Sequence, residues 1–426
     1  MGRLLVNPRS APIRVPTHTL PTHHLAEGES WHFAEGRVGE GRVTCVDIPP
    51  LGFVVSPIED HKQTTVTKQR PLADAGGLLN NEFLEVQLDP ARGHLRSLHT
   101  PAKRGNRLSL MIARRDQLPT PADQPKTSSP RDNKSRAEKT RAGSSDAVQL
   151  SNMVATNLQM LTSSNICGVI RTDGHLEMGK QRVARFQIDY ELWRGSRILE
   201  VNIRLYDLAP LAADSPWQSA YVVRLAWPTD AAILRTVTAG QRHLWNTGQA
   251  ISPTLIEIDE VDYRTHYLTG GLAFHRRTEQ RFMETVLAVS GQTEVSQRIG
   301  IAVDLPHPNL AAEQFLDSHY ELPLSDSSTI TPASGWLANV DARNVSIELE
   351  SPLVDSTGRL VGMRLFVSEF EGRATSAQVR LLRDVASAAR VDYLGGQISK
   401  LTTSGDRVTI ALRAHEQVNV DVLWSK

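Results

Sequence analysis

Apolar and polar residues alternate with a period of two over much of this chain. The clearest runs occupy residues 186–192, 199–205, 221–227, 345–349 and 408–412. Successive side chains of a strand point to opposite faces, so each run predicts a strand with one buried face. The 23 prolines and 28 glycines fall mainly between these runs, where turns need them. The pattern therefore predicts many strands joined by turns.

Helical periodicity is scarce. The best short helix covers Asn309 to Ser318, with Pro308 immediately before it. Many strands with few helices indicate antiparallel sheets stacked as sandwiches. We therefore predict an all-β protein.

Two polar, turn-rich stretches divide the chain into predicted domains. Residues 61–77 form a linker, and a second polar stretch lies at residues 324–335. We expect a small β-sandwich domain, complete or incomplete, in residues 1–60. A large sandwich follows in residues 78–330, and a C-terminal sandwich occupies residues 336–426.

One segment breaks the alternation. Residues 117–146 are rich in Pro, Ser, Lys and Arg, and Leu118 is their single large apolar residue. Such a segment cannot bury enough apolar surface to offset its ordering entropy, so we predict a disordered insertion in a loop. Its cluster of Lys and Arg raises a contact with a polyanion as an alternative, but we favour a solvated loop.

The charge composition argues against two classes of binding partner. The 426 residues contain 47 Lys plus Arg and 47 Asp plus Glu, so the net charge is zero. Nucleic-acid and anionic-membrane binders derive affinity from excess basic charge, so we expect neither partner. No apolar run approaches the roughly 20 residues that span a bilayer, and residues 1–16 lack an apolar core of signal-peptide length. Cys45 and Cys167 are the only two cysteines, and we interpret them as small buried residues. They do not indicate the cellular compartment.

The densest acidic cluster is Glu257, Asp259, Glu260 and Asp262. Glu257 and Asp259 share one strand face at period two, and retaining glycoside hydrolysis needs two carboxyl groups about 5 Å apart. Their neighbours Ile256 and Ile258 favour a simpler interpretation, a solvent-facing polar side opposite a buried one. Calcium coordination and catalysis are the alternatives.

Five residues are candidates for contact with carbohydrate or with a neighbouring domain. His275, Arg276 and Arg277 follow Gly270-Gly271, so a turn can direct three donors into a groove. Sugar rings stack on aromatic faces, which draws attention to Trp193, Trp217 and Trp245 beside turn residues, and Trp193 and Trp245 are the two candidates we keep. Buried core aromatics are the commoner explanation for such residues.

The pair His23-His24 does not predict a metal site, because zinc needs three or four converging ligands. We predict no metal ligand and no catalytic residue in this chain.

Six segments, in order along the chain, resemble the C-terminal β-domain region of glycoside hydrolase family 38, the α-mannosidases. They include the segment GGLLNNEFLEVQLDPARGHLRSLHTPAKRGNRLS and the later segment GGLAFHRRTEQRFMETVLAV. No single motif is as specific as a metal signature, and the strength of the likeness lies in weak matches that occur in the family's order. The likeness therefore spans nearly the whole chain. The matching segments are residues 4–16, 46–53, 76–109, 186–205, 270–304 and 361–426.

The resemblance implies a small sandwich, a very large one of the galactose-mutarotase type and a third sandwich. Complete family members are retaining enzymes that use zinc and an aspartate nucleophile, both supplied largely by an N-terminal barrel that this chain lacks. Their later zinc histidine lies in a His-His-Asp run, whereas Leu25 follows His24 here. No zinc ligand and no nucleophile carries over.

Two functions follow from this resemblance. The chain supports α-mannoside hydrolysis as the non-catalytic portion of an enzyme whose barrel lies on a separate chain. Alternatively, it is a stand-alone carbohydrate-binding or structural module, or a decayed fragment without activity. In either case we expect no hydrolysis by this chain alone.

Overall fold

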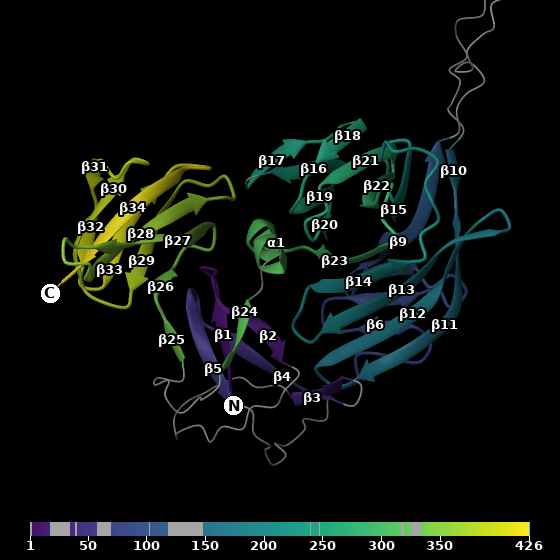
Figure 1. The fold of residues 1–426 in the computed structure, drawn as a ribbon, viewed down its shortest axis with the longest axis horizontal. Coiled ribbons are helices and arrows are strands. Elements are labelled where there is room, and N and C mark those ends of the chain that lie inside the picture. Colours follow the sequence, from purple (N-terminus) through teal and green to yellow (C-terminus); the bar gives the residue numbers. More distant parts are fainter. Residues whose placement is uncertain are drawn as a thin grey trace, which may run out of the picture.

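The computed structural model shows a protein built almost wholly of antiparallel sheets, with one helix among its described residues (Figure 1). The predicted insertion at residues 117–146, apart from Gln117, lies outside the described residues, as do His23, His24 and residues 61–69 of the expected linker. The structure describes residues 2–17, 35–38, 41–57, 70–101, 103–117, 148–238, 240–246, 248–316, 319–324 and 334–425.

Two nine-stranded sheets, which we name L1 and L2, form the large sandwich. L1 runs in the order β18 (Gly248–Ile251), β21 (Phe274–Glu279), β22 (Phe282–Ala288), β15 (Ser219–Ala226), β9 (Lys103–Gln117), β8 (Leu95–Thr100), β7 (Glu85–Leu88) and β6 (Leu78–Asn80), with β10 (Val148–Leu150) also on β9. L2 runs in the order β11 (Asn152–Ser163), β12 (Cys167–Met178), β13 (Gln181–Trp193), β14 (Ile198–Tyr206), β23 (Glu294–Val303), β20 (Tyr263–Leu268), β19 (Leu255–Glu260), β16 (Ile233–Thr238) and β17 (Gln241–Leu244).

The β13–β14 hairpin shows how the alternating pattern builds this core. Phe186 pairs with Leu205 and Tyr190 pairs with Val201, and all four side chains are fully buried between the sheets. Burying one such side chain contributes roughly 1.5–3 kcal/mol. A register slip by one residue would turn this whole apolar row towards the opposite face, so the pattern fixes the pairing.

The N-terminal domain is assembled from distant parts of the chain. Strand β24 pairs with β1, and β25 pairs with β5, although residues 320–324 were expected in the large sandwich. A four-stranded sheet contains β24 (Tyr320–Leu324), β1 (Gly2–Asn7), β5 (Gly52–Pro57) and β25 (Ser334–Trp336), in that order. A three-stranded sheet contains β2 (Ile13–Thr17), β4 (Gly41–Ile48) and β3 (Glu35–Val38).

The C-terminal sandwich packs a four-stranded sheet on a five-stranded one around its own apolar core. The four-stranded sheet has the order β26 (Ala338–Val340), β29 (Thr375–Leu381), β33 (Arg407–Leu412) and β32 (Thr402–Ser404). The five-stranded sheet has the order β27 (Val345–Val354), β28 (Leu360–Glu369), β34 (Gln417–Trp424), β30 (Val385–Val391) and β31 (Gln397–Lys400).

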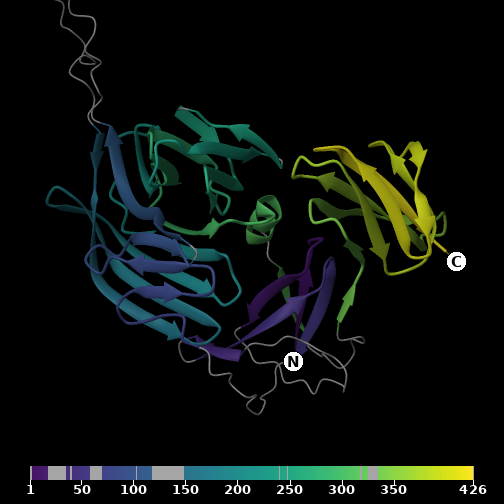
Figure 2. The same cartoon turned by 180° about the vertical axis from the view of Figure 1, so that it is seen from behind.

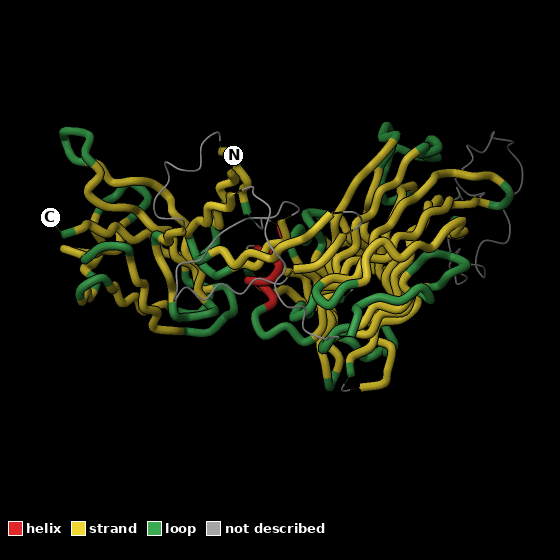
Figure 3. Tube along the Cα trace, turned by 90° about the horizontal axis from the view of Figure 1, so that it is seen from below, coloured by secondary structure: helices red, strands yellow, loops and turns green. Residues whose placement is uncertain are grey.

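Helix α1 (Pro308–Leu316) lies where the three sandwiches approach one another (Figures 1 and 2). Seen from below, it sits between the two halves of the molecule (Figure 3). Its Ala312 and Phe315 pack on the outer face of L2. A Cβ at Gly300 would come within 3.1 Å of Phe315, so glycine leaves room for the helix. The L2 side chains under the helix are Ile198, Val237, Leu255 and Leu268.

The structure confirms the all-β fold, with a large antiparallel super-sandwich flanked by smaller domains, and the short helix after residue 307. Within the described ranges, no helix has the length and apolar character required to cross a lipid bilayer.

Candidate functional site

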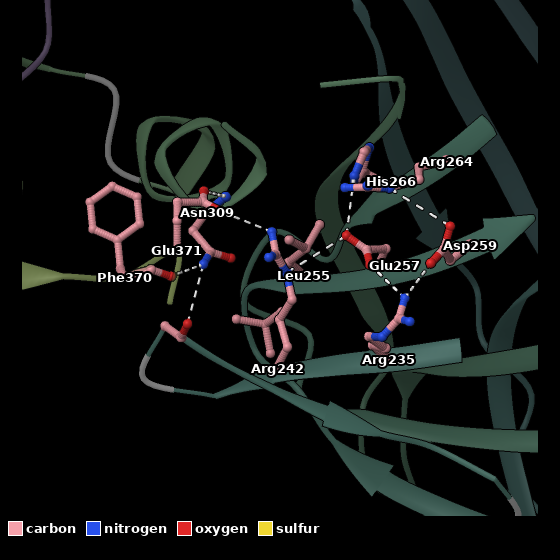
Figure 4. Close-up of polar contacts among 12 residues, drawn as sticks. Arg235, Arg242, Leu255, Glu257, Asp259, Arg264, His266, Asn309, Phe370 and Glu371 are labelled. Carbon is pink, nitrogen blue, oxygen red and sulfur yellow. Dashed lines mark hydrogen bonds and ion pairs between the residues drawn. The ribbon is translucent and has the colours of Figure 1, made fainter. Parts of the chain in front are cut away.

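A row of charged residues crosses the outer face of L2 beside helix α1 (Figure 4). Glu257 on β19 is the direct cross-strand partner of Arg235 on β16 and of His266 on β20. Cross-strand partners point to the same face, so strand register alone brings these three side chains together. Arg235 Nη1 donates to Glu257 Oε1 at 3.0 Å.

Glu257 is a buried carboxylate held ionised by its neighbours. Only 2% of the residue is exposed, and burial by itself would raise its pKa. The His266 ring and the positive charges of Arg242 and Arg264 outweigh burial and lower the pKa of Glu257 to about 2. Its Oε2 lies 3.6 Å from His266 Nε2 and 3.7 Å from Arg242 Nε. A group with this pKa stays ionised at neutral pH and cannot donate a proton.

The acidic cluster therefore differs from its expected solvent-facing role. Asp259 shares the face of Glu257, as predicted, and Arg235 contacts both carboxylates. Glu260 points to the opposite face, where burial beside Tyr263 raises the pKa of its carboxyl group. Of the four acids, Asp262 is exposed at the turn. The solvent-facing interpretation is wrong for Glu257 and Glu260, because their partners lie on other strands.

Arg242 extends this network from L2 to the C-terminal sandwich. Its Nη2 donates to Glu371 Oε2 at 2.8 Å, and the backbone N–H of Asn309 on α1 lies 3.4 Å from Glu371 Oε1. The Asn309 side-chain amide donates to the carbonyl groups of Phe370 and Gly240. We name Arg242, Asn309, Phe370 and Glu371 the junction (Figure 4).

Apolar contacts reinforce the junction. Ala11 of the N-terminal domain, Leu310 of α1 and Phe370 of the C-terminal sandwich form one buried cluster. Gly240, with a φ of 74°, would place a Cβ 3.0 Å from Phe370 Cβ. The N-terminal, large and C-terminal sandwiches therefore contact one another around the N-terminal end of helix α1.

A pocket of about 290 Å³ opens beside the junction. One wall comes from the residues that lead into α1, and the other comes from loops of the C-terminal sandwich. Its lining residues are Pro306, His307, Arg343, Asn344, Glu371, Arg373, Ala374 and Thr375.

The residues present do not fit the zinc ion that the family resemblance implies for complete enzymes. Across the described ranges, no group of three or more His, Cys, Asp or Glu residues is placed to hold a metal ion. Glu257 and His266 lie side by side, but guanidinium groups rather than further ligands surround them.

His275 is a core residue rather than a surface contact. Its side chain is fully buried, with Nε2 2.9 Å from the Ser252 carbonyl oxygen and Nδ1 2.8 Å from Thr285 Oγ1. A carbonyl only accepts, so Nε2 carries the proton and Nδ1 accepts from the Thr285 hydroxyl. Burial lowers the pKa of His275 to about 4. The prediction that it faces a groove is wrong, because β21 alternates and directs this position inwards.

Arg276 and Arg277 use their guanidinium groups to hold backbone. Arg276 Nη1 donates to the Trp217 carbonyl at 2.7 Å. Arg277 donates to the carbonyl groups of Asn246 and Gln280. Neither arginine is directed at another domain by these contacts, so both anchor turns of the large sandwich.

The predicted tryptophans have different surroundings. Trp245 is 5% exposed and packs in the core near His275, which agrees with the interpretation of a buried aromatic and not with that of a contact residue. Trp193 is half-buried, and its Nε1 donates to Glu191 Oε1 at 2.5 Å. Both rings contribute chiefly to packing.

Trp217 meets two exposed residues on the outer face of L1 that the sequence did not single out, and we name the three together the Trp217 patch (Trp217, Ile251 and Phe274). The Trp217 and Phe274 rings meet edge to face with centroids 6.0 Å apart, and Ile251 is the cross-strand partner of Phe274. Phe274 is 47% exposed and Ile251 is 62% exposed. Arg115 and Arg276 both donate to the Trp217 carbonyl, so the loop that carries this ring is fixed.

Comparison with known proteins gives a structural match. No protein-family model matches the sequence, and no curated protein matches it significantly. An α-mannosidase from Enterococcus faecalis V583 aligns with 99% of this chain and 56% of its own, at a TM-score of 0.64 and 8% identity. A glycosyl hydrolase family 38 protein from Enterococcus faecalis aligns with 99% of this chain and 58% of its own, at a TM-score of 0.65 and 8% identity.

These matches confirm the predicted likeness in fold to family 38 α-mannosidases over almost the entire chain. The chain spans a little over half the length of the two solved structures, 56% and 58%.

We predict that His275 makes stability depend on pH. The unfolded chain binds a proton on this ring with a pKa near 6.5, but the folded protein does so only near 4. Its contribution is complete above pH 6.5 and is lost as the pH falls towards 4, by about 2 kcal/mol at pH 5. Urea unfolding at pH 7.5 and pH 5 should show a shallower pH dependence in His275→Gln than in the wild type. The exposed His243→Gln should keep the wild-type dependence, and equal slopes in all three proteins would contradict the assignment.

We predict that the junction ion pair stabilises the fold. In a double-mutant cycle of Arg242→Gln and Glu371→Gln, we expect a coupling energy of about 1–2 kcal/mol, because both groups are partly buried. Arg380 and Asp406 form a comparable pair with side chains 56% and 29% exposed, and should couple by less than about 0.5 kcal/mol. Equal coupling in the two cycles, measured by urea unfolding, would show that the junction pair has no special role.

Proposed function

We propose that this chain is the non-catalytic β-sandwich portion of an α-mannosidase-like glycoside hydrolase, working with a catalytic barrel that lies outside this sequence. The observation that carries the proposal is the fold similarity over 99% of the chain to just over half of an α-mannosidase. In this role the chain supplies a scaffold and one wall of a substrate cleft, while the barrel supplies zinc and the nucleophile.

The electrostatics of the charged row support a structural role. Glu257, the most buried carboxylate of the row, is ionised and faces Arg235, Arg242 and His266. Retaining glycosidases need one protonated carboxyl group besides the nucleophile. The row stabilises the attachment of the C-terminal sandwich to the large sandwich instead, as a rigid support for another domain requires.

The proposal is tested by reconstitution. The DNA upstream of the Met1 codon is translated and searched for a barrel with His-x-Asp and His-His-Asp motifs. Both parts are then produced separately and together with zinc, and hydrolysis of 4-nitrophenyl α-mannoside is measured, with the β-anomer as the control substrate. We expect turnover of the α-anomer only when both parts are present. Robust turnover by this chain alone, or no barrel-bearing reading frame, contradicts the proposal.

A second candidate function is carbohydrate binding by this chain on its own. The Trp217 patch favours it, because the exposed Phe274 beside the half-buried, fixed Trp217 offers an apolar face to a sugar ring. Arg276, one of the predicted contact residues, would act here by positioning Trp217 rather than by touching the sugar.

The patch is tested with α-mannan oligosaccharides in a tryptophan-fluorescence titration. We expect Phe274→Ala to weaken binding about tenfold, since one stacking contact of ~1.4 kcal/mol corresponds to that factor. Tyr393→Ala, which removes an aromatic ring 90% exposed on the C-terminal sandwich, is the matched control and should bind as the wild type does. The absence of binding by the wild type would remove this function.

A further inference from the structure

The pocket beside the junction carries more positive than negative charge. Arg343 and Arg373 line it, and neither guanidinium meets a carboxylate or another acceptor among the residues that the structure describes. Glu371 is the one acidic residue of the lining, and its carboxylate is already engaged by Arg242 at 2.8 Å. Two guanidinium groups are therefore available to a ligand.

Helix α1 adds to this positive field. Its first residue, Pro308, directly follows the lining residues Pro306 and His307. The positive end of the helix dipole lies at this turn and favours an anion. Its N–H groups are largely engaged already, since that of Asn309 lies 3.4 Å from Glu371 Oε1 and that of Ala311 donates to the His307 carbonyl.

Hydrogen bonds hold the pocket wall that the loops of the C-terminal sandwich form. The buried Glu369 accepts backbone N–H groups from Glu371, Gly372 and His415 at 2.7–3.0 Å. The Asn344 amide joins Glu369 to the Arg373 carbonyl, with both distances 3.0 Å. A wall held in this way loses little conformational entropy when a ligand binds, which favours affinity.

We propose that this pocket binds a monosaccharide-sized ligand that bears a carboxylate or phosphate group. Guanidinium groups form paired, charge-assisted hydrogen bonds with either anion. Asn344, Thr375 and His307 offer further hydrogen-bonding groups for sugar hydroxyls. The volume of about 290 Å³ lies near the lower end of small-molecule sites, which span about 300–1,000 Å³. The proposal rests on the charge and the lining of this pocket and not on α-mannoside hydrolysis.

The test is calorimetric titration of the full chain with four probes, namely glucuronate, glucose 6-phosphate, glucose and inorganic phosphate. We expect the two charged sugars to bind, glucose not to bind detectably, and inorganic phosphate to bind at least about tenfold more weakly than glucose 6-phosphate. The stronger of the two charged sugars identifies the preferred anion.

Substitutions inside and outside the pocket test whether the charged sugars bind there. Arg343→Gln with Arg373→Gln should weaken charged-sugar binding by about tenfold or more while the unfolding midpoint stays unchanged, because both side chains are exposed. Arg359→Gln removes an exposed arginine from the same sandwich, outside the pocket, and should bind as the wild type does. No binding of either charged sugar, equal binding of glucose, phosphate binding as tight as that of glucose 6-phosphate, or an unaffected double variant each overturns the proposal.

Discussion

The packing of helix α1 on the outer face of L2 is the constraint on which the arrangement of the whole molecule depends. A half-buried sheet must cover its apolar positions, and here Phe315 and Ala312 cover Leu255 and Leu268. The same helix carries Leu310 into a cluster shared by the other two sandwiches. Removing the helix would expose apolar surface in all three parts at once, so their relative placement rests on nine residues.

The charged residues around this helix serve the same end. Arg242 lies between a carboxylate of L2 and a carboxylate of the C-terminal sandwich, and Asn309 spans the remaining gap with its amide. Burying ions is costly unless each has a partner, which explains why guanidinium groups surround Glu257. Chemistry that needs a shared proton would require a different setting, one with fewer cations and a second acid of raised pKa.

Local patterns were sufficient for elements whose partners are nearby in sequence. The alternation of Phe186 and Ile188 with polar residues predicted β13, and the short apolar period after Pro308 predicted α1. Local patterns failed where partners distant in sequence decide whether a side chain is buried. His275 is buried because Thr285 and the Ser252 carbonyl satisfy both ring nitrogens, and Glu257 is buried because Arg235 lies across from it. The sequence drew attention to Trp217 but not to its neighbours, since Ile251 and Phe274 meet only through strand pairing.

The pairing of β1 with β24 has a consequence for biosynthesis. During synthesis, β1 can pair with β24 only after Tyr320, the cross-strand partner of Val6, has been added to the chain. At ~5–20 residues per second, that delay is on the order of 15–60 s for a chain emerging from the ribosome. During this interval the edge of β1 is an open template for any other extended segment. Nascent copies on one messenger RNA would therefore benefit from a chaperone that shields the first strand until the last partner arrives.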